Sequence, residues 1–433
     1  MAETPTLRRL LVTGGAGFIG SCYVRDVLGR RDGTHITVLD KLTYAGNEAN
    51  LATVRDDPEM AARFGFVRGD IADPAVVDPL VAAADAVVNF AAESHVDRSI
   101  LDPEAFLATG VIGVHVLLEA CRTAPNKPRF LQVSTDEVYG SVDEGHATED
   151  APLAPRSPYA AAKAAGELLV RSYVITHGVD AVVTRGSNTY GPYHHPEKLI
   201  PLFVTNAIDD RPLPLYGDGL QRREWLYVSD HAGAIDFVLR HGETGETYNI
   251  AGPTERTNRD VVALLLDHLG KPWSLVMQVE DRPGHDRRYA MDGTKLAGLG
   301  WQPRTTFEDG LAATIDWYTT NEAWWRAYQP SQSPERAARH QASFAVYQSM
   351  VAPRPSSNVM PGCQPRLASF VPSIAYRRSW PGRSSTCITS DQGLPRWSRR
   401  SATTSRLVRS VGPAMLYVSP VSPWRNTKSI APA

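Results

Sequence analysis

The chain has 433 residues, of which 42% are hydrophobic and 21% are charged, and its formal net charge is −2. This length exceeds one ordinary domain and the apolar content excludes a wholly disordered chain, so we expect one large or two medium-sized globular domains. The charge is unevenly distributed, because residues 351–433 carry eleven Arg and one Lys against one acid, Asp391, whereas the first 350 residues hold 33 basic and 46 acidic side chains.

The first part of the chain, residues 7–186, alternates short apolar runs with longer helical patterns, which is typical of βαβ units in a parallel sheet. Helices are predicted for Phe18–Gly29 and for the segment from Glu104 to Arg122, which is rich in Ala, Val and Leu. We therefore expect an α/β fold for this part, a Rossmann-type doubly wound parallel sheet of six strands. The predicted strands are Arg9–Val12, Ile36–Asp40, Phe64–Arg68, Ala86–Asn89, Arg129–Ser134 and Ala181–Arg185.

Residues 187–330 are less regular and contain many Pro and Gly, which predicts a smaller mixed α/β domain packed against the sheet edge. Helices are predicted for Asn258–Leu269 and Phe307–Ala327. Ligands of open α/β sheets bind beyond the carboxyl ends of the strands. The second domain is therefore expected to close over that crevice and to bind the substrate.

The end of the chain divides into a junction, residues 331–353, and a basic tail rich in Ser, Pro and Arg, residues 354–433. This composition, without a helical or strand period, predicts a disordered extension. Two other interpretations are a basic arm that binds nucleic acid and a tail translated out of its proper reading frame. The tail lacks the interleaved basic and aromatic clusters that nucleic-acid binding favours, so no nucleic-acid partner is expected.

Three features of the sequence bear on the location of the protein. No run of 18 consecutive apolar residues is present, so no membrane partner is expected. Residues 1–9 lead directly into a predicted strand, so no signal peptide is expected. The four Cys are scattered without metal-ligand spacing, which predicts a cytoplasmic protein without a metal site.

A glycine-rich loop follows the first predicted strand and opens the first predicted helix. Gly14, Gly17 and Gly20 allow a tight turn, a close approach to a pyrophosphate and close packing of the helix, whose N-terminus attracts phosphate. Asp40 lies twenty residues after Gly20, at the end of the second strand, where a carboxylate binds a ribose 2′-hydroxyl and repels a 2′-phosphate. The combination favours NAD over NADP and over a purely structural turn, so residues 7–186 are expected to form an NAD-binding domain.

Two further segments are expected near the cofactor. Asp70-Ile71 follows the third predicted strand and is placed to reach the adenine. Phe90-Ala91-Ala92-Glu93-Ser94 follows the fourth, and its small residues let the loop pass close to the cofactor.

A Tyr/Lys pair lies at the start of an Ala-rich helical run, in Tyr159-Ala160-Ala161-Ala162-Lys163. The i, i+4 spacing places both side chains on one helix face. A nearby ammonium lowers the pKa of a tyrosine and makes it a usable base for a hydroxyl proton. A chance surface pair is the alternative, and the position after a nucleotide loop argues against it.

The strand that ends at Ser134 is followed by Thr135-Asp136-Glu137. Two adjacent acids at the carboxyl end of a buried strand point to where a substrate binds. One carboxyl can protonate a leaving hydroxyl while the other removes a carbon-bound proton, provided that their environments differ. The alternative is a solvent-exposed turn or helix cap.

With these motifs, residues of about 7–330 resemble the extended short-chain dehydrogenases, and specifically the dTDP-glucose 4,6-dehydratases. The resemblance implies an enzyme in which Tyr159, assisted by Lys163, removes the C4 hydroxyl proton while NAD takes the C4 hydride, and Thr135 hydrogen-bonds the reacting hydroxyl. Glu137 then removes the C5 proton while Asp136 protonates the departing C6 hydroxyl. Hydride returns to C6, which gives a 4-keto-6-deoxy sugar nucleotide.

The resemblance also implies a set of binding residues. Asn188 matches a ligand of the substrate diphosphate, whereas Thr189 stands where the family usually has a second Asn, which leaves one NAD contact in doubt. The implied cofactor-binding residues are Gly14, Gly17, Phe18, Ile19, Gly20, Asp40, Lys41, Leu42, Thr43, Asp70, Ile71, Phe90, Ala91, Ala92, Ser94, Thr109, Tyr159 and Lys163. The implied substrate-binding residues are Ser94, Thr135, Asn188, Lys198, Leu199, Pro214, Leu215, Tyr216, Arg223, Asn258, Asp281, Arg282, Pro283, Gly284 and His285.

Other functions remain open from the sequence. A dehydratase or 4-epimerase that acts on a UDP-, CDP- or GDP-linked sugar shares most of these motifs, although an epimerase does not need Asp136 and Glu137. A non-catalytic NAD-binding sensor is the alternative of another class. The family usually forms homodimers through a helix bundle, which the segments Glu104–Arg122 and Tyr159–His177 could supply.

Overall fold

The computed structural model describes residues 7–281 and 285–328. The chain separates into two units, Met1–Pro355 and Ser356–Ala433, and all described residues belong to the first. The predicted junction at 331–353, the predicted tail at 354–433 and the three residues Arg282, Pro283 and Gly284 lie outside the described residues.

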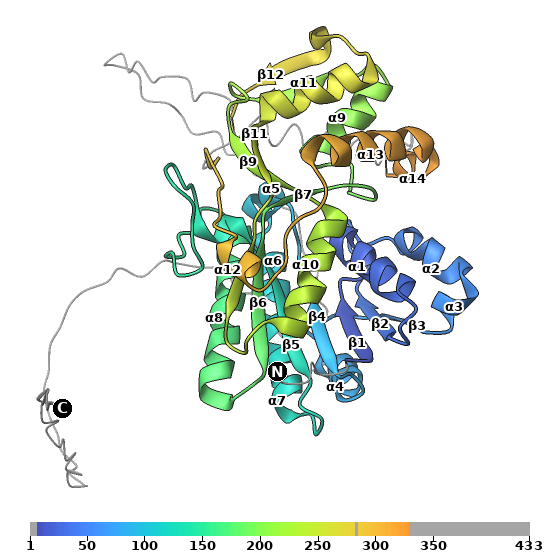
Figure 1. The fold of residues 1–433 in the computed structure, drawn as a ribbon, viewed down its shortest axis with the longest axis vertical. Helices are drawn as coiled ribbons and strands as arrows, with labels where there is room; N and C mark the ends of the chain where they lie inside the picture. The colour runs from blue at the N-terminus through green and yellow to red at the C-terminus, as the bar shows by residue number, and fades with distance from the viewer. Residues whose placement is uncertain (1–6, 282–284, 329–433) are drawn as a thin grey trace, which may run out of the picture. The chain divides into compact units, whose positions relative to one another are not determined.

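A seven-stranded sheet lies at the centre of the described part (Figure 1). Its strands run in the order β10-β6-β5-β4-β1-β2-β3, and every neighbouring pair is parallel. This order confirms the predicted doubly wound sheet, in which β1 lies between the two halves. The strands are β1 Arg9–Thr13, β2 His35–Asp40, β3 Phe64–Arg68, β4 Ala86–Asn89, β5 Arg129–Thr135, β6 Ala181–Gly186 and β10 Thr247–Ile250.

The seventh strand corrects the prediction of six. β10 comes from the segment that the sequence assigned to the second domain, and it pairs with β6 from Thr247↔Val183 to Ile250↔Gly186. β10 has the sequence Thr-Tyr-Asn-Ile, which lacks the continuous apolar run by which the equally short β4 is recognised. The chain therefore leaves the sheet after β6 and returns later to form its edge.

Helices cover both faces of this sheet because its strands are buried on both sides. Leu10 and Val12 of β1 pack with α1 and α10 on one face, whereas Leu11 between them packs with α4, α7 and α8 on the other. The helices of this part are α1 Phe18–Gly29, α2 Ala52–Asp56, α3 Pro58–Ala61, α4 Pro74–Ala82, α5 Val96–Leu101, α6 Pro103–Leu107, α7 Val114–Thr123, α8 Pro158–His177 and α10 Val228–His241.

The predicted helix from Glu104 to Arg122 is interrupted in the structure. α6 and α7 are separated by a π-helical turn at Ala108–Gly113. The combined helix Pro103–Thr123 is long and apolar enough to cross a membrane by length and composition alone, a test that core helices of soluble proteins also pass. In the structure α7 packs against α4, α8 and the sheet, which is the environment of a core helix.

Helix α8 carries the predicted Tyr/Lys pair and has well-defined ends. Ser157 caps its N-terminus by accepting from the backbone N–H of Ala160 at 3.1 Å, and Pro158 occupies the first turn. Gly178 ends the helix with φ 66°, a left-handed conformation that glycine adopts readily. These signals place Tyr159 and Lys163 in the first two turns, next to the end of β5.

The remaining elements form a smaller assembly above the sheet in Figure 1. A three-stranded sheet has the order β11-β9-β7, and β12 pairs with β8. Around them Phe203, Leu265 and Phe307 form a separate apolar core. The elements are β7 Asn188–Tyr190, β8 Leu213–Tyr216, β9 Arg222–Tyr227, β11 Thr254–Thr257, β12 Val276–Val279, α9 Leu199–Ile208, α11 Asn258–Leu269, α13 Phe307–Thr320 and α14 Glu322–Arg326. The short helix α12, Thr294–Gly298, packs instead against β10 of the central sheet.

The last predicted helix, Phe307–Ala327, is two helices in the structure. α13 ends at Thr320, and Asn321 has φ −114° and ψ 42°, which breaks the helix before α14. The break turns Trp325 into the apolar core, where its side chain is fully buried.

Candidate active site

A cavity of about 340 Å³ lies at the carboxyl ends of the central strands and is closed by residues that follow β6. It brings together the glycine loop, the Thr135-Asp136-Glu137 triplet and the Tyr/Lys pair. The predicted site residues that line it are Gly14, Gly17, Phe18, Ile19, Gly20, Asp40, Lys41, Thr43, Asp70, Ile71, Phe90, Ala91, Ala92, Ser94, Thr109, Thr135, Asp136, Glu137, Tyr159, Lys163, Asn188, Lys198 and Leu199. Leu42 was also predicted, but it is not part of this lining.

The glycine loop is packed too closely for side chains. Gly14 has φ 68°, and a Cβ on it would lie 2.6 Å from the backbone nitrogen of Ala91. A Cβ on Gly20 would lie 2.4 Å from the carbonyl oxygen of Gly14. The loop leads into α1, whose N-terminus has no side-chain cap, so its N–H groups remain suited to an anion.

Asp40 lies at the end of β2 and faces the same cavity. Its Oδ2 accepts from the backbone N–H of Ala16 at 2.9 Å and its Oδ1 accepts from Leu42 at 2.8 Å. Burial raises the pKa of this carboxyl. Each oxygen keeps one lone pair for a ribose hydroxyl, so the loop and Asp40 together fit a dinucleotide without a 2′-phosphate.

Asp136 and Glu137 follow the end of β5, and the carboxyl of Asp136 accepts hydrogen bonds from two uncharged side chains. The Thr135 hydroxyl donates to Oδ1 of Asp136 at 3.0 Å, and the Asn188 amide donates to Oδ2 at 3.3 Å. Burial, followed by the charge of Glu137, raises the pKa of Asp136 to about 7. Asp136 is therefore protonated to a large extent at neutral pH and is able to act as an acid.

Tyr159 and Lys163 both line the cavity, but their protonation differs from the sequence expectation. The pKa of Tyr159 is raised, first by burial and then by Glu137, while a hydrogen bond with Thr135 opposes the shift. Lys163 donates to the carbonyl oxygen of Val133 at 2.9 Å, and burial lowers its pKa to about 8. The expected lowering of the tyrosine pKa is thus wrong for this structure, because desolvation and the charge of Glu137 raise the pKa instead.

Several predicted substrate residues lie outside the cavity lining. Arg223 is buried, donates to the carbonyl oxygens of Arg222 and Asp286 at 2.7 and 2.8 Å, and stacks on Tyr289. Leu215 is a core residue. The other described members that are not part of the lining are Pro214, Tyr216, Asn258, Asp281 and His285.

Some of these residues form a second polar group beside β8, β9 and α11. Gln221 donates to Oδ2 of Asp281 at 2.8 Å, and His285 lies 2.6 Å from Oδ1 of the same carboxyl. The imidazole of His285 meets the ring of Tyr216 edge-on, with ring centroids 6.2 Å apart. A tyrosine ring in such a group is suited to stack on a nucleotide base.

The cavity also contains polar residues that sequence reasoning missed. His194 stacks on Phe18 with ring centroids 4.1 Å apart, and burial lowers its pKa. Burial and two nearby cations likewise lower the pKa of His195 to about 4. Glu197 follows in the same short segment. The sequence signal for this group is the concentration of titratable residues, His194, His195 and Glu197, just before Lys198.

His231 and Thr189 were also missed as a pair. His231 comes from α10, far along the chain from the catalytic motifs, and its Nδ1 lies 2.7 Å from the Thr189 hydroxyl. A single histidine on a helix, without other titratable residues beside it in the sequence, does not indicate a functional site.

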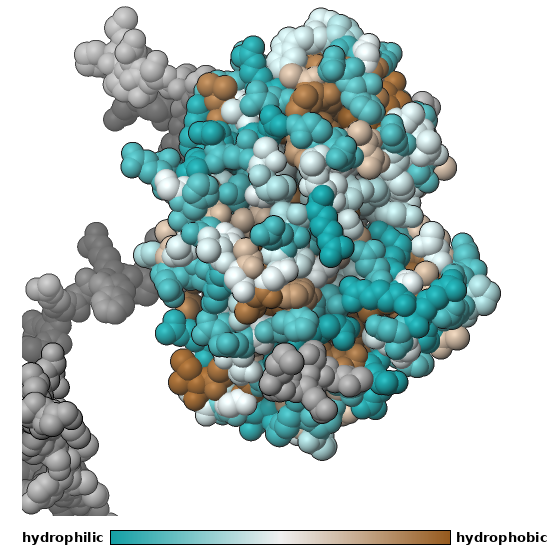
Figure 2. Space-filling model, viewed as in Figure 1, coloured by the Kyte–Doolittle hydropathy of each residue, from teal (hydrophilic) through white to brown (hydrophobic). Residues whose placement is uncertain are grey.

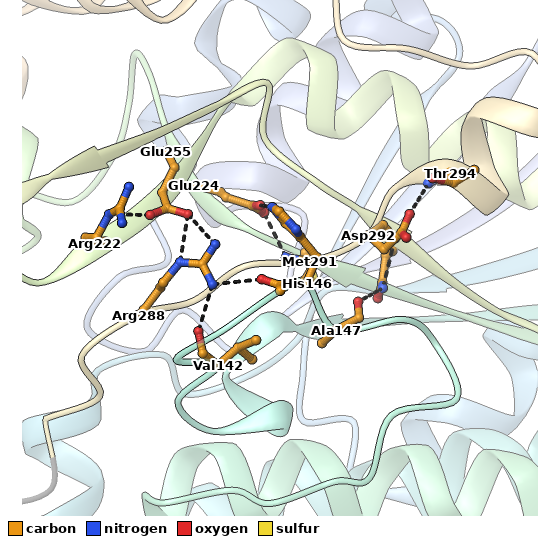
Figure 3. A network of polar contacts seen from close by, with 12 residues as sticks. Val142, His146, Ala147, Arg222, Glu224, Glu255, Arg288, Met291, Asp292 and Thr294 are labelled. Atoms are coloured by element: carbon orange, nitrogen blue, oxygen red, sulfur yellow. Dashed lines mark hydrogen bonds and ion pairs between the residues drawn. The ribbon is translucent and has the colours of Figure 1, made fainter.

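A network of charged side chains holds the loop that follows the triplet against β9 and β11 (Figure 3). Arg288 donates to the carbonyl oxygens of Val142 and Gly145 at 3.0 and 2.7 Å. Its guanidinium also pairs with Glu255 at 2.8 Å, and Glu255 pairs in turn with Arg222. These contacts fix the far side of the segment that carries the acid pair.

Glu224 is the buried carboxyl of this network (Figure 3). It accepts from the backbone N–H of Met291 at 3.2 Å, and His146 lies 4.0 Å away. Burial, with a smaller effect of the nearby Asp136, raises its pKa from 4.5 to about 8. Among the described residues, no group of three or more His, Cys, Asp or Glu side chains is arranged to hold a metal ion.

Comparison with known proteins places this geometry among nucleotide-sugar enzymes. The family described as GDP-mannose 4,6-dehydratase matches residues 11–314. A dTDP-glucose 4,6-dehydratase from Streptomyces antibioticus is 56% identical over 322 residues, which cover 73% of this chain and 94% of that protein.

Solved structures give the same result. The crystal structure of a dTDP-glucose 4,6-dehydratase from Streptomyces venezuelae with NAD bound is 52% identical, has a TM-score of 0.71, and matches 74% of this chain and 100% of that chain. A UDP-glucose 4-epimerase from Thermus thermophilus in complex with NAD is 33% identical, with a TM-score of 0.66 over 72% of this chain and 99% of that chain.

Proposed function

This chain belongs to the dTDP-glucose 4,6-dehydratase family, and on that premise we propose that it converts dTDP-glucose to dTDP-4-keto-6-deoxyglucose with NAD as its cofactor. The observation that carries the proposal is the buried Asp136, whose pKa is raised to about 7 and which shares one cavity with Glu137, the Tyr/Lys pair and a dinucleotide loop. A dehydration needs such an acid, whereas hydride transfer alone does not.

The first step is removal of the C4 hydroxyl proton. Tyr159 is the base, and Thr135, which is hydrogen-bonded to it, orients the reacting hydroxyl. When bound, NAD accepts the C4 hydride, later returns it to C6, and brings the positive charge of its oxidised ring. Lys163 adds a second positive charge near the phenol, so the tyrosinate becomes accessible in the loaded enzyme.

The second step is elimination of water across C5 and C6. The new C4 ketone acidifies the C5–H bond, and Glu137 removes that proton. Asp136 donates its proton to the departing C6 hydroxyl, in line with its raised pKa. Glu137 then returns its proton to C5 when C6 is reduced.

These steps leave a proton imbalance that the geometry can resolve. In each turnover Tyr159 gains one proton and Asp136 loses one. The Thr135 hydroxyl hydrogen-bonds to both groups, at 3.0 Å in the case of Asp136. We propose that Thr135, which lies between the two residues, relays the proton from Tyr159 back to Asp136.

The substrate is held from both sides of the cavity. Asn188 and Lys198 supply donors for a diphosphate, and Lys198 is held in place by donating to the carbonyl oxygen of Ser94 at 2.6 Å. We assign the thymine base to the second polar group, where Tyr216 offers a ring for stacking. The buried Arg223 acts through its contacts with neighbouring carbonyl oxygens rather than as an exposed phosphate ligand.

The direct test is mass spectrometry of the product formed from dTDP-glucose by the purified full-length chain. The expected product is lighter by one water, with no net NADH. No product from dTDP-glucose, together with turnover of a UDP-, CDP- or GDP-linked sugar, would refute the proposed substrate. A double Asp136→Asn, Glu137→Gln variant that retains turnover would instead identify an epimerase.

We also propose that the protein is a homodimer. Exposed apolar side chains gather on the helices around α8, and Figure 2 shows an apolar patch over the lower end of that helix. Patches of this kind mark protein interfaces. The exposed apolar residues of α5, α6, the π-helical turn and α8 are Ile100, Leu101, Leu107, Ile112, Leu168 and Ile175. Light scattering should give twice the chain mass, and a Leu168→Glu, Ile175→Glu variant should give the monomer.

We place the protein in the cytoplasm. In the described part of the chain Cys22 and Cys121 are buried free thiols, and burial raises the pKa of each to about 12. Unreactive reduced thiols are typical of a reducing compartment. Cell fractionation with antibody detection checks this assignment.

A further inference from the structure

One wall of the cavity carries buried, uncharged polar atoms without a partner among the described residues. Oγ of Ser187 and Nε2 of His231 have no hydrogen bond in this part of the chain, although the two residues are only 4% and 2% exposed. Both residues line the cavity. Because buried polar groups are nearly always paired, the two atoms are expected to meet a ligand.

The hydrogen-bond chain behind this wall sets the role of the imidazole. The Thr189 hydroxyl donates to the carbonyl oxygen of Ser187 at 3.1 Å, and His231 Nδ1 lies 2.7 Å from the same hydroxyl. A hydroxyl has only one proton to donate, so Nδ1 carries the hydrogen and donates to Thr189. Nε2 is then an acceptor, while the free hydroxyl of Ser187 is a donor.

The wall lies next to the reacting groups. A Cβ on Gly186 would lie 2.4 Å from Nε2 and Cε1 of His231, so the imidazole edge rests directly on the end of β6. Gly186 is paired with Thr135 in the sheet. Burial lowers the pKa of His231 to about 4, which leaves the ring uncharged and compatible with a cationic pyridinium.

One acceptor beside one donor is complementary to a primary carboxamide, which offers an N–H and a carbonyl oxygen. We propose that His231 and Ser187, with Thr189 orienting the imidazole, bind the carboxamide of the pyridine ring of NAD. The assignment rests on the proposed function only for the identity of the cofactor.

The test compares NAD with its 3-acetylpyridine analogue, which keeps the carbonyl oxygen but replaces the amino group by a methyl group. Affinities are measured by isothermal titration calorimetry on the full-length protein stripped of nucleotide, so no turnover is needed. The wild type should prefer NAD by about tenfold, as expected for one hydrogen bond. His231→Leu should weaken NAD binding by about tenfold and abolish the preference, while binding of the analogue stays unchanged.

Ser187→Ala provides a second, independent variant. It should weaken NAD and the analogue equally, because both keep the carbonyl oxygen. Thr184→Val is the matched control, since its buried hydroxyl on β6 also lacks a partner in the described part but does not line the cavity. It should leave both affinities unchanged.

An unchanged preference in His231→Leu, or weaker binding of dTDP-glucose with unchanged NAD binding, would overturn the assignment. Circular dichroism establishes that each variant is folded, and Ser187→Ala decides the matter if His231→Leu is not. If instead the proposed function is wrong, the protein still binds NAD more tightly than the 3-acetylpyridine analogue but does not consume dTDP-glucose.

Discussion

At the scale of single residues, the environment of two adjacent carboxyls decides what each can do. Asp136 is buried beside Glu137, which keeps its pKa near 7, while the hydrogen bond that it accepts from Thr135 opposes this shift. Glu137 lines the same cavity one residue later. In the proposed mechanism these two adjacent acids take opposite roles, because burial favours the protonated form of Asp136.

Replacing Asp136 by Asn should stop the reaction after oxidation. The amide cannot protonate the leaving hydroxyl, so kcat should fall by about 10²–10⁴-fold, and NADH should accumulate on the enzyme. Absorbance at 340 nm records the accumulation. Asp143→Asn, on the exposed loop beyond the triplet, is the control and should behave as wild type. Normal turnover of Asp136→Asn would exclude this residue as the acid.

The raised pKa of Asp136 also predicts a pH dependence. The acid must be protonated to act, so kcat should fall as the pH rises above about 7, and it should approach a tenfold fall per pH unit. Because Asp136 and Glu137 interact, the apparent pKa belongs to the pair. A profile of kcat against pH at saturating dTDP-glucose measures it, and a flat profile between pH 7 and 9 would contradict the assignment.

Glu224 and Glu255 are neighbouring carboxyls, and we expect that replacing each by an uncharged Gln changes the stability of the fold at pH 8 in opposite directions. The pKa of Glu224 is raised from 4.5 to about 8, so its contribution to stability is complete below about pH 4.5 and is lost as the pH rises toward 8. Glu224→Gln should therefore raise stability at pH 8 by at least about 1 kcal/mol, and the melting temperature by a few degrees.

Glu255→Gln should instead lower the melting temperature. Its carboxylate lies between Arg222 and Arg288, and an amide would leave two cations without their shared counter-charge. Calorimetric melting of both variants at pH 5 and pH 8 gives the comparison. A destabilised Glu224→Gln variant at pH 8 would show that this carboxyl is ionised in the folded protein.

At the scale of elements, helix α1 offers two glycines with different surroundings. A Cβ on Gly20 would lie 2.4 Å from the Gly14 carbonyl oxygen, whereas on Gly29 the nearest atom lies 3.8 Å away. Gly20→Ala must displace the nucleotide loop and should weaken NAD binding at least about tenfold. Gly29→Ala should bind NAD normally and gain up to about 1 kcal/mol of stability. Calorimetric titration with NAD and thermal melting check both.

How well an element could be predicted from sequence depended on whether its signals are local. Phe18–Gly29 and Asn258–Leu269 were predicted with their observed bounds, because a glycine loop opens the first and Gly270 ends the second. β10 was missed because its polar Thr247 and Asn249 break the apolar run that marks the equally short β4. The break at Asn321 was missed because the burial of Trp325 against α13 and its neighbours is a tertiary contact.

The candidate site follows the same division. The glycine loop, the triplet and the Tyr/Lys pair are contiguous motifs, and the structure brings them to one cavity. The Thr189–His231 pair and the protonation of Tyr159 depend on residues that meet only in the fold. Both the Thr189–His231 contact and the raised pKa of Tyr159 arise in the buried interior of the fold, and the spacing of residues along the sequence does not show which side chains are buried together.

At the scale of the whole molecule, the active site is complete well before the end of the chain. Every residue that lines the cavity lies at or before His231, and the family match ends at residue 314. Removing residues 354–433 should therefore leave kcat/KM within about twofold of the full chain. Steady-state assays with dTDP-glucose measure this, and a large loss would make the basic segment part of the enzyme.

The matched comparison is a variant that ends after Asn321 and therefore lacks more of the chain. It removes the fully buried Trp325, together with Trp324, which donates to the side chain of Asn50 at 3.0 Å. Tyr328 is lost as well, and its hydroxyl accepts from Asn47 at 2.5 Å. This variant should melt at a lower temperature and lose NAD more readily, because these contacts fasten the segment beside the cofactor loop.

The late return of β10 to the sheet has a consequence for synthesis on the ribosome. β6 is complete at Gly186, but the strand that covers its edge ends at Ile250, roughly 60 residues later. At typical translation rates of about 5–20 residues per second, that edge waits for several seconds. An uncovered parallel strand is a template for wrong pairing between nascent chains. Slow codons between residues 187 and 250 should therefore lower soluble yield more than slow codons after residue 260.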